Sequence, residues 1–144
     1  MTAVLSRTRW WRAVACCLSL GGIVSCSSPS GPTSASLGQA FQLTVGGSTT
    51  ISSENLQVGF EQVLSDSRCP RGTQCIVAGN AIARVWLSKS SAGREQRELG
   101  TSSETNAVYD AYRIALTTLS PSPEAGATIR PADYVATLIV TRSP

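Results

Sequence analysis

Apolar and polar residues alternate in short runs along most of the chain after residue 36. In residues 81–87, one face of an extended segment would carry only alanine, valine and leucine, and the other would carry Ile82, Arg84 and Trp86. Alternation with a period of two is typical of a β-strand with one buried face. The same pattern predicts strands in residues 41–45, 49–51, 56–63 and 112–116, and a weaker, polar edge strand in residues 95–99.

Several details of these strands are also predicted. The pair Gly46-Gly47 between the first two runs favours a tight hairpin turn. The apolar register shifts near Glu61-Gln62, which indicates a β-bulge. Residues 134–141 are apolar or β-branched at nearly every position, which is typical of a strand covered on both faces. Helical periodicity is weak throughout, and residues 103–111 are the best candidate.

The number and spacing of these strands predict an all-β domain. Six to eight short strands separated by turn residues favour an antiparallel β-sandwich, immunoglobulin-like, or a small barrel. We place this domain in residues 37–144, a normal size for one hydrophobic core. Residues 27–36 are rich in serine, proline and glycine and are predicted to form a flexible tether, because such a composition buries too little apolar surface to fold.

The N-terminal segment has the pattern of a secretory signal. Three arginines precede an apolar run in residues 13–24 that is too short to span a bilayer. The run ends in Ile23-Val24-Ser25-Cys26 and resembles a bacterial lipoprotein signal peptide with its lipobox. The resemblance implies cleavage of residues 1–25 and acylation of Cys26. Two or three acyl chains anchor a protein stably to a membrane.

Charge and composition narrow the functional classes. The formal net charge of +3 comes from the three N-terminal arginines, and the remaining nine basic residues match nine acidic ones. A nucleic-acid-binding domain is expected to carry a basic face, so we exclude nucleic acid as a partner. Nothing in the sequence indicates a cofactor.

After the signal and the lipidated cysteine, two cysteines remain. We predict a disulfide between Cys69 and Cys75, because disulfides persist in exported proteins. A structural zinc ion would need four ligands, and the chain contains no histidine and no third mature thiol. No metal site is therefore expected.

The loop around this disulfide is the best candidate for a binding site. Asp66 can accept backbone N–H groups in an Asx turn, and a disulfide-closed loop would hold Arg68, Arg71 and Asn80 rigidly. We interpret these three residues as candidate ligand or partner contacts. The alternative is a purely structural crossover between sheets, with Asp66 and Arg68 paired locally.

One string in this loop resembles a known group of proteins. The residues Asp66-Ser-Arg-Cys-Pro70, Cys75 and Ala78-Gly79-Asn80 are similar to a motif of small bacterial secreted proteins and lipoproteins. In that motif an aromatic residue often precedes the Ala-Gly step, where this chain has Val77. The resemblance implies a β-sandwich and no particular activity.

Enzymatic chemistry is difficult to assemble from this sequence. Without histidine, Ser-His-Asp and Cys-His catalysis are excluded. Ser–Lys catalysis would need Lys89, which we interpret as a turn residue, and a carboxylate-dependent hydrolase would need residues such as Glu61 and Asp66. We therefore do not expect an enzyme.

Two aromatic residues have simple structural interpretations. We expect the stem of Arg84 to pack on Trp86. Tyr134 follows Pro131-Ala-Asp133 and resembles the corner tyrosine that fixes a loop in immunoglobulin-like sandwiches.

The sequence thus predicts an exported, lipid-anchored binding module. Its expected location is a membrane surface, the periplasmic side of the outer membrane in a two-membrane bacterium and otherwise the outer face of the cell membrane. The expected partner is an envelope protein or a small ligand. The alternatives are a sandwich that inhibits proteases and, less favoured, a carboxylate-dependent hydrolase.

Overall fold

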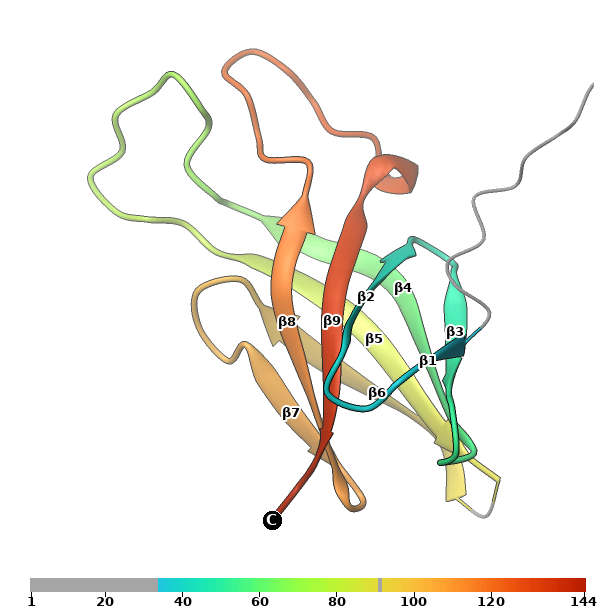
Figure 1. Ribbon diagram of the computed structural model, residues 1–144. Helices are drawn as coiled ribbons and strands as arrows, with labels where there is room; N and C mark the ends of the chain where they lie inside the picture. The colour runs from blue at the N-terminus through green and yellow to red at the C-terminus, as the bar shows by residue number, and fades with distance from the viewer. Residues whose placement is uncertain (1–33, 91) are drawn as a thin grey trace, which may run out of the picture.

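The computed structural model describes residues 34–90 and 92–144, which form two β-sheets packed face to face (Figure 1). Within these residues there are nine strands and one short 3-10 helix. The elements are β1 (Ser34–Ala35), β2 (Ala40–Thr44), β3 (Ser48–Ile51), β4 (Leu56–Asp66), β5 (Ala81–Lys89), β6 (Ala92–Gly100), β7 (Asn106–Tyr109), β8 (Tyr112–Ser120), η1 (Pro131–Asp133) and β9 (Val135–Arg142).

The strands divide between a five-stranded and a four-stranded sheet. The five-stranded sheet has the order β1-β3-β4-β5-β6, and the four-stranded sheet has the order β2-β9-β8-β7. All pairings are antiparallel except that of β1 with β3. The predicted antiparallel β-sandwich is confirmed.

The hydrophobic core fills the space between the sheets. In β5 every second residue from Ala81 to Leu87 is fully buried, as the alternation predicts. The four-stranded sheet contributes the opposite side of the core. Its buried side chains include Phe41, Tyr109, Tyr112, Ile114 and Leu138.

The predicted hairpin in residues 41–51 is wrong, because β2 and β3 belong to different sheets. β2 pairs with β9, and β3 pairs with β4. The turn itself is present, since the Gly47 N–H donates to the Thr44 carbonyl at 2.8 Å and Gly46 has a φ of +80°. A glycine turn specifies a chain reversal, but it does not specify which strand the next segment joins.

Two further expectations are corrected. The weak helical pattern in residues 103–111 is instead β7 and the turn that follows it, with Asp110 at a φ of +50°. The last strand is covered on one face only: Val135, Thr137 and Ile139 remain half-exposed on the outer face. β-branched residues suit a strand even where one face meets solvent.

Other details agree with the sequence. The register of β4 against β5 shifts between Phe60 and Gln62, at the predicted bulge. β6 is an edge strand, as its polar composition indicates. The first strand of the described residues, β1, lies within the predicted tether and pairs with β3.

The predicted signal peptide, the acylated Cys26 and most of the tether lie outside the described residues. In the part of the chain that the structure describes, no helix is long and apolar enough to cross a membrane.

Candidate functional site

Two long loops leave the same end of the sandwich, opposite the C-terminus (Figure 1). The disulfide loop, residues 67–80, connects β4 to β5, and the β8–β9 loop, residues 121–134, includes η1. The loops are joined by a bridge between Arg71 and Glu124, in which the Arg71 N–H donates to the Pro123 carbonyl at 2.9 Å. They therefore form one continuous surface.

Asp66 and Arg68 fix the start of the disulfide loop. The Arg68 guanidinium forms a two-pronged ion pair with the Asp66 carboxylate, with N–O distances of 2.6 and 2.8 Å. It also donates to the backbone carbonyls of Leu119 and Pro121 at 2.5 and 2.8 Å. The Arg68 N–H donates to Asp66 at 3.1 Å, which is the predicted Asx turn. The pair links the end of β4 to the end of β8 in the other sheet.

Tyr134 completes this network from the β8–β9 loop. Its hydroxyl donates to the Asp66 carboxylate at 3.0 Å, so its expected role in fixing a loop is met by a long-range contact. Burial opposes ionisation of Asp66, but the hydrogen bonds from Arg68 and Tyr134 outweigh it and lower the Asp66 pKa. The hydrogen bond to Asp66 raises the pKa of Arg68, and burial raises the pKa of Tyr134.

The predicted disulfide is confirmed. Cys69 and Cys75 are bonded, with their Cα atoms 6.0 Å apart. Inside the ring, Gly72 has a φ of +79°, and the Thr73 N–H donates to the Pro70 carbonyl at 3.2 Å. The ring is thus a cross-linked turn.

Asn80 closes the loop at its base. Its side-chain oxygen accepts hydrogen bonds from the backbone N–H groups of Thr101 and Ser102 at 2.8 and 2.9 Å. Its backbone pairs with Ser67, whose hydroxyl donates to the Asn80 carbonyl at 2.8 Å. Gly79 is required here, because a Cβ atom at this position would lie 1.5 Å from the Ser67 carbonyl oxygen.

The structure therefore separates the three candidate contact residues. Arg68 and Asn80 direct their polar groups into the protein, where they hold the loop in place. Arg71 is exposed, and its guanidinium makes one long hydrogen bond to the Ser122 hydroxyl at 3.4 Å. Of the three, Arg71 is the residue presented to solvent.

Sequence reasoning missed Ile76 and Val77. These aliphatic side chains lie on the disulfide loop with exposed fractions of 104% and 75%. A signal was available, because the two residues lie between the disulfide and the Ala78-Gly79 step, outside any strand pattern. Fully exposed aliphatic side chains on a fixed loop are candidates for a protein contact.

The residues considered for enzymatic chemistry are engaged in other contacts. Glu61 accepts a hydrogen bond from Gln96 at 2.7 Å. Lys89 bonds to Tyr112 and Asp110, and these hydrogen bonds raise its pKa. A raised pKa makes Lys89 a poorer general base. The described residues contain no group of three or more metal-binding side chains.

The comparisons with known proteins found no matching family model, curated protein or solved structure.

Proposed function

We propose that this protein is an exported, lipid-anchored binding module that contacts an envelope protein through its disulfide loop. The lipobox ending at Cys26 and the Cys69–Cys75 disulfide support an exported location. The neutral balance of charges after the signal supports a protein partner rather than nucleic acid.

The exposure of Ile76 and Val77 on a loop held at both ends carries this proposal. Asp66–Arg68 holds the start of the loop, Asn80 holds its base, and the disulfide closes the turn between them. A loop that is already ordered loses little conformational entropy on binding. The fully buried centre of a protein interface is more apolar than the rest of the surface, and arginine is among the residues that contribute most to binding energy.

This proposal divides the loop into contact and support residues. Arg71, Ile76 and Val77 make the contact, and Arg68 and Asn80 position the loop. An Arg68→Ala variant would therefore alter the loop as well as its surface. A test that changes only the contact residues, and keeps Arg68, avoids this ambiguity.

The test is cross-linked capture from cell envelopes with the full-length, acylated protein. We expect the Ile76→Ser/Val77→Ser variant to capture at least about tenfold less of the partner than the wild type. The reason is that two aliphatic side chains that become buried in the proposed complex would be lost. The matched control is Val108→Ser, an aliphatic residue on β7 with an exposed fraction of 47%. Equal capture by the wild type, the Ile76→Ser/Val77→Ser variant and the Val108→Ser variant would contradict the proposal.

A protease-inhibitor function is the second candidate. A rigid, exposed, disulfide-closed loop is also the shape that inserts into a protease cleft, and Ile76-Val77 would occupy the cleft. Inhibition assays against cysteine and serine proteases, with the same variants, distinguish a protease inhibitor from a module that binds an envelope protein. Inhibition that is lost in Ile76→Ser/Val77→Ser and kept in Val108→Ser would favour the inhibitor.

A further inference from the structure

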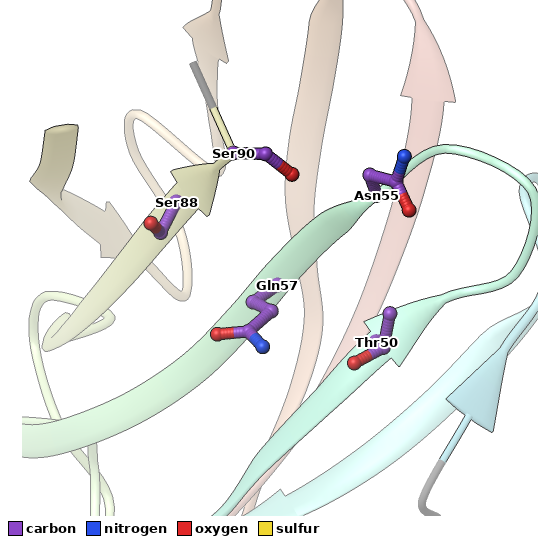
Figure 2. Close-up of a pocket in the computed structure, with 5 residues that line it drawn as sticks. All are labelled: Thr50, Asn55, Gln57, Ser88 and Ser90. Carbon is purple, nitrogen blue, oxygen red and sulfur yellow. The ribbon is translucent and has the colours of Figure 1, made fainter. Parts of the chain in front are cut away.

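A second site lies away from the loops, on the outer face of the five-stranded sheet. A pocket of about 230 Å³ is lined by Thr50, Asn55, Gln57, Ser88 and Ser90 (Figure 2). The residues come from β3, β4, β5 and the turns beside them. Its volume is below the range of about 300–1,000 Å³ that is typical of sites for drug-sized ligands, so it suits a small ligand or one small unit of a longer molecule.

Strand register builds the pocket around Gln57. Gln57 is the direct cross-strand partner of Thr50 on β3 and of Ser88 on β5. Figure 2 shows the Gln57 side chain between these two residues, with Asn55 and Ser90 at the end of the strands. Neighbouring strands lie about 4.8 Å apart, so the three side chains form a short, closely spaced row across the sheet.

None of these five side chains hydrogen-bonds to any other residue in ranges 34–90 and 92–144. Each hydroxyl offers one donor and two acceptor positions, and each amide offers two donors and a carbonyl oxygen. All five are uncharged. The pocket is therefore suited to a neutral ligand that carries both donors and acceptors, and it suits neither an ion nor an apolar ligand.

The next cross-strand pair of β4 and β5 on the same face of the sheet as the pocket is Gly59 and Trp86. Trp86 lies two residues from Ser88 on the same face of β5, and its ring covers Gly59, its cross-strand partner. The Arg94 guanidinium stacks on the ring, 3.8 Å from its centre. This stack holds Trp86 on the same outer face of the sheet, although the indole is not one of the residues that line the pocket.

We propose that this pocket binds an N-acetylated amino sugar within a glycan chain. An acetamido group needs one acceptor for its N–H and one donor for its carbonyl, and a single carboxamide such as that of Gln57 supplies both. The hydroxyls of Thr50, Ser88 and Ser90 and the amide of Asn55 then meet the sugar hydroxyls. This site is independent of the disulfide loop.

The test is isothermal titration of the full-length protein, in a detergent without a sugar headgroup, with two matched oligosaccharides. Chitotetraose carries an acetamido group on each ring, and cellotetraose carries a hydroxyl in its place. We expect chitotetraose to bind and cellotetraose to bind at least tenfold more weakly. Equal binding of the two, or no binding of chitotetraose at millimolar concentration, overturns the proposal.

Variants locate the binding. Gln57→Ala and Gln57→Glu should each weaken chitotetraose binding at least tenfold, the second by adding a charge to a neutral pocket. Because Gln57 is exposed, thermal unfolding should be unchanged in both. Gln42→Ala, which removes an exposed glutamine on β2 of the other sheet, is the matched control. Binding that survives both Gln57 variants overturns the assignment of the site.

Discussion

At the scale of single residues, Asp66 determines how the loop end of the sandwich is held. Its carboxylate accepts hydrogen bonds from the Arg68 side chain, the Arg68 backbone and the Tyr134 hydroxyl. The side chain is only 10% exposed, so its charge is stabilised by the protein rather than by water. The sequence predicted the Asx turn and offered the pairing with Arg68 as the structural alternative to a contact role, because these partners are two residues apart. The contact with Tyr134, 68 residues away, required the fold.

The lowered pKa of Asp66 predicts a dependence of stability on pH. A carboxylate with a lowered folded-state pKa stabilises the protein above its unfolded pKa, about 3.9 for Asp. That contribution is lost as the pH falls through the folded-state value. We expect Asp66→Asn to be less stable than the wild type at pH 7, with the difference shrinking below about pH 4. Urea unfolding from pH 7 to pH 2 measures this, and a constant difference across the range would contradict the prediction.

At the scale of elements, β4 and β5 show how backbone and side chain are fitted together. Gly59 on β4 is the cross-strand partner of Trp86 on β5. The indole occupies the space that a side chain at residue 59 would need. The Arg84 guanidinium pairs with Glu98 at 3.0 Å, and it is the Arg94 guanidinium that stacks on the Trp86 ring. The packing of the Arg84 stem on Trp86 stays a prediction. Residue spacing along β5 could not show that β6 supplies the arginine that stacks on this ring.

We predict that Gly59→Ala destabilises the protein by about 1–3 kcal/mol, the usual cost of overpacking. The added Cβ atom would lie 2.1 Å from the Trp86 ring, so the indole would have to move. The control is Gly93→Ala on β6, where a Cβ atom would have no neighbour within 4 Å.

A double-mutant cycle tests the cause of this loss. Trp86→Leu in the Gly59→Ala background should remove most of the penalty, because the two positions are in contact. If the two substitutions were additive in urea unfolding, the steric explanation would be wrong.

At the scale of the whole molecule, Arg68 connects the two sheets at the loop end. It lies just after β4 of the five-stranded sheet, and it donates to carbonyls at the end of β8 of the four-stranded sheet. At the opposite end, Glu54 accepts hydrogen bonds from Tyr112 on β8 and Arg142 on β9. Polar contacts thus join the sheets at both ends of the hydrophobic core.

We predict that Arg68→Ala lowers the free energy of unfolding by about 2–4 kcal/mol, because it leaves the Asp66 carboxylate without its charged partner in a mostly buried position. Arg71→Ala, an exposed arginine on the same loop, should change stability by no more than about 0.5 kcal/mol. Chemical denaturation of both variants measures this. Similar losses in the two would show that Arg68 has no special structural role.

The sequence by itself determined what depends on near neighbours and on pattern. Alternation predicted the strands and the sandwich, the register shift predicted the bulge in β4, and the two cysteines left after the predicted lipidated cysteine indicated the Cys69–Cys75 disulfide. Each of these follows from the periodicity of the chain or from groups a few residues apart.

Tertiary structure decided which distant segments meet. It placed β2 and β3 in different sheets, directed Arg68 and Asn80 inward and left Ile76 and Val77 in solvent. It also gathered Thr50, Gln57 and Ser88 into one neutral pocket. The physical reason is that a turn residue or a polar side chain has several partners of similar energy within the sequence, and only the packing of the two sheets selects one of them.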